Sequence, residues 1–149
     1  MFKEIVTLIA DLAGAVDPTF VIGAKLQAGH QLQDAPVRRV LLLETGGTPY
    51  FYPNTDMVDM TIQVLCRAAT YWEARDDAWV VYDTVHGTSG WDMPRLVGVG
   101  DDYLVATVNA MAAPAYLGVD DNRRHLFSTN YIFRVEEGSC GPTSGSGSI

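Results

Sequence analysis

The fold of this chain is decided by residues 57–87, which read MVDMTIQVLCRAATYWEARDDAWVVYDTVHG. In the first third of this stretch apolar and polar residues alternate, as they do in a strand with one buried face. The predicted core face carries Met60, Ile62, Val64 and Cys66. Cys66 is therefore expected to be a small buried side chain rather than a nucleophile.

The remainder of the stretch predicts a helix with a defined start and end. Thr70 and Glu73 have the spacing of a capping box, in which each side chain satisfies a backbone N–H of the first turn. Apolar residues then recur at helical spacing as far as Val85, and His86-Gly87 closes the helix, with His86 as a favourable cation at its C-terminus. The acidic residues that this spacing assigns to the solvated side are Asp76, Asp77 and Asp83.

The rest of the chain adds one helix and several strands. The pattern predicts an amphipathic helix at residues 2–16, strands at 37–44, 103–112 and 125–135, and a weaker strand at 20–26. A turn at Gly46-Gly47 is expected to end the strand at 37–44. The apolar face expected for the strand at 103–112 carries Leu104, Ala106, Val108 and Ala110.

This order of elements predicts an α+β fold, with a single mixed, mainly antiparallel β-sheet and two α-helices packed on one face. We expect residues 1–137 to form one domain. Residues 138–149 are rich in glycine and serine and are predicted to be a flexible tail.

Charge and hydropathy exclude two classes of function. The net charge is −8, and lysine and arginine never run longer than a pair, which argues against a surface that grips nucleic-acid phosphates. No apolar run approaches the roughly 20 residues that a membrane span needs. Residues 1–16 are too amphipathic for a signal peptide, so we expect a soluble protein that starts in a cytoplasm.

The sequence offers no recognisable reaction chemistry. His30, His86 and His125 are scattered without the spacing of metal ligands, and the paired acidic residues at 101–102 and 120–121 lie in predicted turns. No pattern places one carboxylate of such a pair in an apolar pocket. We therefore predict no catalytic, cofactor-binding or metal-binding residues, and a protein that is not an enzyme.

Aromatic residues exceed what a monomer of this size needs. Tyr50, Phe51 and Tyr52 follow one another in a loop or hairpin arm, where they either pack locally or form a projecting adhesive tip. Trp72 and Trp79 are seven residues apart, on one flank of the predicted helix, where they are either half-buried or part of an interface. The candidate interface consists of Tyr50, Phe51, Tyr52, Trp72, Trp79 and Trp91.

Two stretches, with the order of the elements, resemble a known family. They are LETGGTP at residues 43–49 and DNRRHLFSTNY at residues 121–131. Together with the N-terminal helix and the strand–helix unit at 57–87, they resemble the tail terminator and minor capsid proteins of long-tailed, siphovirus-like bacteriophages. The resemblance covers about residues 1–137.

The resemblance implies a small α+β virion protein that assembles as a ring, usually a hexamer, on the last ring of the tail tube. Such a ring stops tube polymerisation and offers a docking surface for the head connector, and DNA passes through its lumen without specific binding. The implied location is the head-proximal end of the tail, after assembly in the host cytoplasm. Excess acid suits a channel wall because it repels DNA phosphates.

Two other functions stay open at this point. A head–tail connector or stopper protein, which completes the head, is similar in size to a tail terminator. A small ligand-binding or enzymatic α+β domain would instead carry a pocket between the sheet and the helices. The absence of convergent polar residues on the predicted core faces speaks against that second alternative.

Overall fold

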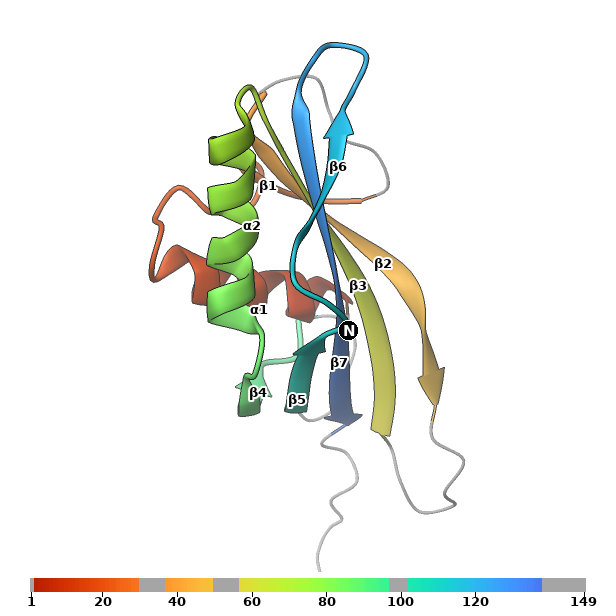
Figure 1. Cartoon of the computed structure of the whole chain (residues 1–149). Helices are drawn as coiled ribbons and strands as arrows, with labels where there is room; N and C mark the ends of the chain where they lie inside the picture. Colours follow the sequence, from red (N-terminus) through yellow and green to blue (C-terminus); the bar gives the residue numbers. More distant parts are fainter. Residues whose placement is uncertain (1, 30–36, 50–56, 97–101, 138–149) are drawn as a thin grey trace, which may run out of the picture.

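The computed structural model of the chain describes residues 2–29, 37–49, 57–96 and 102–137. The helices are α1 (Phe2–Gly14) and α2 (Tyr71–Val85). The strands are β1 (Leu26–Ala28), β2 (Arg39–Pro49), β3 (Met57–Ala68), β4 (Ser89–Met93), β5 (Tyr103–Ala110), β6 (Ala115–Val119) and β7 (His125–Glu137). Figure 1 shows both helices on one side of a strongly twisted sheet, so the predicted α+β architecture is confirmed.

The strands form one sheet in the order β1-β2-β3-β7-β5-β4, and β6 pairs with the first part of β7. Only β1 and β2 run parallel, while every other pair in the described residues is antiparallel. Long strands β3 and β7 lie side by side in the centre, from Met57↔Glu136 to Ala68↔His125. The sheet is therefore mixed and mainly antiparallel, as predicted.

The core lies between the sheet and the two helices. Ile62, Val64 and Cys66 of β3 are fully buried there, as their alternation predicts. Burying one such aliphatic side chain stabilises the fold by about 1.5–3 kcal/mol relative to leaving it in water. The neighbouring strand β7 contributes Phe127, Tyr131, Phe133 and Val135. The helices contribute Ile5, Leu8 and Ile9 from α1 and Ala74, Ala78, Val81 and Val85 from α2.

Both ends of α2 are set by local contacts. The Thr70 hydroxyl accepts a hydrogen bond from the backbone N–H of Glu73 (3.2 Å) and donates one to the Glu73 carboxylate (3.1 Å). Thr70 is therefore the predicted N-cap, although the Glu73 carboxylate meets the hydroxyl rather than a backbone donor. At the other end Gly87 has φ +86°, a left-handed conformation that suits glycine.

His86 is the C-cap residue of α2, as the sequence predicts. Its Nδ1 accepts a hydrogen bond from the backbone N–H of Ala110 (2.9 Å). The ring also stacks on Tyr82, with centroids 4.9 Å apart. His86 thus links the end of α2 to the end of β5.

Two predictions about the strands before β3 are wrong. Residues 20–26 turn rather than extend, and the first strand begins only at Leu26. Gly46-Gly47 does not end β2 but forms a bulge within it, where the pairing with β3 shifts between Glu44 and Gly47.

A second bulge changes the buried face of β5. The pairing with β7 shifts between Val105 and Thr107, so the buried residues are Tyr103, Val105 and Val108. The predicted face of Leu104, Ala106, Val108 and Ala110 is therefore wrong in its first half. Strands β4 and β6 were not predicted, because glycine and proline surround them.

We expect Thr70→Ala to lower the free energy of unfolding by about 1 kcal/mol, because a backbone N–H at the start of α2 loses its acceptor. Urea unfolding followed by circular dichroism measures the change. Thr70→Ser keeps the hydroxyl and is the matched control, with a stability close to that of the wild type. Equal losses in both variants would show that the methyl group, not the cap, matters.

Candidate functional site

The candidate interface residues fall at three separate places. Tyr50, Phe51 and Tyr52 lie outside the described residues. Strand β2 ends at Pro49 and β3 begins at Met57, and Pro49 pairs with Val58, so the three aromatics belong to the connection of a hairpin. Their role in contacts between molecules stays a prediction.

The two tryptophans of α2 are unequally exposed. Trp72 is 67% exposed and touches Tyr71 edge-on, with ring centroids 5.2 Å apart. Trp79 is half-buried against Tyr82 (5.1 Å), and the guanidinium of Arg75 lies 5.3 Å from its ring. They sit two turns apart on one helix, as their spacing predicts.

Trp91 lies apart from these two, on strand β4 at the end of the strand order. Its side chain is 44% exposed. A shallow hollow of about 100 Å³ separates it from α1 and includes Glu4, Asp11 and Asp92 in its wall. Within the part of the chain that the structure describes, no ring contact links Trp91 to the two tryptophans of α2.

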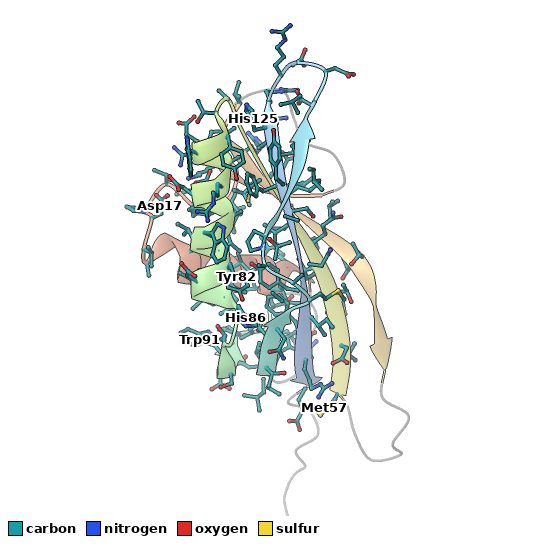
Figure 2. The ribbon with its side chains drawn as sticks, in the orientation of Figure 1. Asp17, Met57, Tyr82, His86, Trp91 and His125 are labelled. Atoms are coloured by element: carbon teal, nitrogen blue, oxygen red, sulfur yellow. The ribbon has the colours of Figure 1, made fainter. Side chains whose placement is uncertain are left out.

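An aromatic cluster that the sequence did not reveal joins α2 to the β6–β7 hairpin. Tyr71 packs against Tyr116 (5.1 Å) and Phe127 (5.2 Å), and the Tyr116 hydroxyl lies 2.9 Å from Nδ1 of His125. Figure 2 shows His125 near the upper end of the sheet. The contacts fix the position of β6, whose sequence gives no strand signal of its own.

Beside this cluster, β6 and the turn before it expose apolar side chains. Leu117 is 57% exposed, Val119 54% and Met111 58%. A hollow of about 200 Å³ lies between Met111, Leu117 and β7, and its lining also includes alanines 112, 113 and 115 and the polar residues Ser128, Thr129 and Asn130. This is an apolar surface with few polar groups, which suits protein contacts better than a reaction.

The turn between β6 and β7 is held by one carboxylate. Asp120 accepts hydrogen bonds from the backbone N–H groups of Arg124 and Asn122 (both 2.9 Å) and from Nε of Arg124 (2.8 Å). The bond from the Arg124 backbone is the main reason that the pKa of Asp120 lies below its ordinary value. Arg123 at the tip has φ +60°, which is uncommon outside glycine.

The prediction that Asp77 is solvated is wrong. Asp77 is 1% exposed, and its Oδ1 lies 2.7 Å from Nζ of Lys25 and 2.9 Å from Nη2 of Arg38. Its Oδ2 accepts from Nε of Arg38 (2.9 Å), which makes that pair bidentate. Asp77 is three residues after Ala74 and four before Val81, so it lies on the buried stripe of α2.

Further carboxylates complete this charge cluster. Lys25 also contacts Asp17 (3.2 Å) and Thr19 (3.1 Å), and Arg38 contacts Glu73 (3.3 Å). Hydrogen bonds from Thr19 and Lys25 lower the pKa of Asp17 despite its partial burial. Hydrogen bonds to Asp77 raise the pKa of Arg38. A hollow of about 340 Å³ lies beside Lys25 and Arg38, and both cations already form ion pairs with Asp77.

Two other buried groups have shifted pKa values without forming a reactive site. Burial raises the pKa of the Cys66 thiol, as expected for a side chain packed in the core. Burial opposes ionisation of Glu4, but hydrogen bonds outweigh it, among them one from the backbone N–H of Leu96 (2.9 Å), and the pKa falls to about 2. Within the described ranges, no three metal-ligating side chains gather closely enough to hold an ion.

Comparison with known proteins identifies the family. Residues 20–137 match the family model described as "Bacteriophage tail terminator protein". The chain belongs to this family. The tail terminator is also similar to a chain of a solved structure titled "Virion of native gene transfer agent (GTA) particle", with a TM-score of 0.60 and 13% identity over 88% of this chain and 91% of that one. At this identity the likeness shows a shared fold. The search of curated proteins gave no match.

Membership confirms the family resemblance drawn from residues 43–49 and 121–131. The tail terminator is a structural protein of the phage virion, at the end of the tail. None of its helices in the described part is long and apolar enough to span a membrane.

We expect Asp77→Asn to lower the free energy of unfolding of the tail terminator by about 3 kcal/mol, because Lys25 and Arg38 lose the carboxylate that neutralises them. Urea unfolding at pH 7 measures the change. Asp76→Asn, at the exposed neighbouring position, is the matched control and should change stability by less than about 0.5 kcal/mol. Similar effects of both substitutions would contradict the assigned role of the buried pair.

Proposed function

We propose that this tail terminator assembles as a homo-oligomeric ring, a hexamer, on the last ring of the tail tube. The ring stops tube polymerisation and offers the docking surface for the head connector. The observation that carries the proposal is the match of residues 20–137 to the tail terminator family. The proposed location is the head-proximal end of the tail, reached by assembly in the host cytoplasm.

The surface of the subunit supports a role in assembly. A closed ring repeats one heterologous contact, so each subunit needs two different patches that complement each other. Exposed apolar residues gather at more than one place, including Leu117 and Val119 on β6 and Trp72 on α2. Large exposed apolar patches are uncommon on monomers and mark contact surfaces.

The charge of the chain supports a ring through which DNA passes without being bound. A net charge of −8 repels phosphates from the wall of a lumen. The buried Lys25 and the partly exposed Arg38 are neutralised by carboxylates within the fold and do not offer a phosphate site. DNA therefore passes through the proposed ring without specific binding.

The family match favours a terminator over a head–tail connector or stopper. A small enzyme or ligand-binding domain has less support, because the hollows beside β4, β6 and Lys25 are shallow and bring no nucleophile and base together. These hollows are lined mainly by apolar atoms or by cations that are already paired.

Electron microscopy of phage particles that lack this protein tests the proposed function. We expect overlong tails, or tails that fail to join heads, because tube growth loses its stop and the connector loses its docking surface. Complementation with the wild-type chain should restore normal length and infectivity. Normal particles without the protein would contradict the proposal.

We also expect replacement of Tyr50, Phe51 and Tyr52 together by serine to impair assembly while leaving monomer stability nearly unchanged. The physical reason is that aromatic side chains on a hairpin connection gain more from burial against another subunit or tube protein than from the monomer core. Complementation of the deleted phage measures assembly, and thermal unfolding measures stability. A large loss of melting temperature would place the three residues in the core instead.

A further inference from the structure

We propose that the hollow between α1 and β4 receives one lysine or arginine side chain of a different virion protein, which docks on the terminator. This inference rests on the proposed function and adds a contact site and the chemistry of its partner. It is carried by the lining of the hollow, by two carboxylates without an ion pair and by the inventory of cations in the chain.

The hollow has the size of a single side chain. Its volume is about 100 Å³, whereas pockets for small molecules usually measure about 300–1,000 Å³. The buried side chains of Leu8 and Met93 belong to its lining, together with Trp91 and Leu96, which are 44% and 49% exposed. Figure 2 shows Trp91 at β4. An occupant therefore meets mostly apolar atoms.

Two carboxylates from different elements border this apolar lining. Asp11 belongs to α1 and Asp92 to β4, and both are exposed. In the described part of the chain neither forms an ion pair. The third acid of the lining, Glu4, is buried and accepts the backbone N–H of Leu96 (2.9 Å), so it already serves the fold. Asp11 and Asp92 are thus the charges that an occupant meets.

The nearest cations of the chain do not neutralise these two carboxylates. Lys3 is exposed on α1 and forms no ion pair with a described residue. It precedes Asp11 by about 12 Å along the helix axis. The guanidinium of Arg95 lies over the ring of Tyr103, 4.4 Å from its centroid. A cation from outside therefore finds both carboxylates available.

The lining selects a basic side chain over other occupants. Lysine and arginine bury an aliphatic stem along apolar surface and carry their charge at the end. The stem suits Leu8 and Met93, and the charge suits the face of Trp91, since tryptophan is the aromatic side chain that attracts cations most strongly. An apolar occupant would desolvate the two carboxylates without pairing them, and an acidic one would be repelled.

The occupant belongs to another protein because this chain lacks a suitable cation. All ten of its lysines and arginines lie in described residues. All but two are held by ion pairs, by aromatic rings or by burial, namely Lys25, Arg38, Arg39, Arg67, Arg75, Arg95, Arg124 and Arg134. Of the two others, Lys3 stands on the same helix as Asp11. Arg123 has the exposed Asp121 beside it, which the acids of the hollow would repel.

Two double variants test the site by complementation of phage that lack the wild-type protein. Asp11→Asn combined with Asp92→Asn, the hollow variant, removes both charges and keeps the shape of the hollow. Asp83→Asn combined with Asp121→Asn removes two other exposed carboxylates and is the matched control. Circular dichroism and light scattering check the fold and the oligomeric state of each purified chain. Electron microscopy counts particles with normal tails joined to heads.

We expect the hollow variant to match the wild type in fold and oligomeric state but to give at least about tenfold fewer normal particles. The reason is that the cation of the partner loses its acceptors at a buried contact. The control should match the wild type in all three measurements. A hollow variant that gives as many normal particles as the wild type would overturn the proposal. Equal losses in both variants would also overturn it, because lost acid alone would then explain them.

A cross-link identifies the occupant without changing either carboxylate. The photoreactive residue p-benzoylphenylalanine replaces Leu96, which lines the hollow, and mass spectrometry maps the links formed in assembled particles. We expect a link to another virion protein within a few residues of a lysine or arginine. A link to a second copy of this chain, a link to a segment without a basic residue, or no link at all in normal particles would contradict the proposed occupant.

The outcomes separate this inference from the proposed function. If particles that lack the protein are normal, the proposed function and this site both fall. If those particles are defective and the hollow variant restores them as fully as the wild type, the function stands and the docking site is wrong.

Discussion

The buried carboxylate of Asp77 is the constraint on which the packing of α2 against the turn before β1 and the start of β2 depends. It ties α2 to the turn that carries Lys25 and to the start of β2 at Arg38, three segments far apart in the chain. A charge this deeply buried is tolerated only when its partners are in place. The cluster therefore fixes where the turn sits on the helix, and with it which apolar residues of that turn, Val21 and Ile22, are left facing outward.

The strand–helix unit at residues 57–87 was predictable because its signals are local. Alternation within β3, the hydroxyl of Thr70 and the glycine after α2 each act within a few residues, and each has the predicted structure. The core face of β3 follows for the same reason, since burial of one face imposes a period of two. The candidate interface could be predicted only in part. Trp72 is exposed and Trp79 is half-buried, but their spacing in the sequence does not show this difference in exposure.

What the sequence could not reveal depends on distant partners. Asp77 lies on the buried stripe of α2, yet its charge predicts a solvent-exposed side chain. The sequence does not show that Lys25 and Arg38 lie beside it and neutralise it. Gly46-Gly47 has the composition of a turn, but pairing with β3 continues past it and makes it a bulge. Strand β6 has almost no pattern of its own. It is a strand because the Asp120 turn directs it back onto β7 and because Tyr116 packs against Tyr71 and Phe127.

These nonlocal features also produce the asymmetry of the subunit. Within the described residues, β1 is hydrogen-bonded at Leu26 to the turn before it, and β6 pairs with β7 and with no second strand. Two open edges would let copies add through either side by strand pairing, which favours uncontrolled growth. The proposed ring needs a repeated contact of unlike surfaces, and such a contact closes into a ring when its rotation divides a full turn. Closure of such a ring leaves no free contact surface along its circumference, which is the physical difference between the proposed finite cap and another polymer.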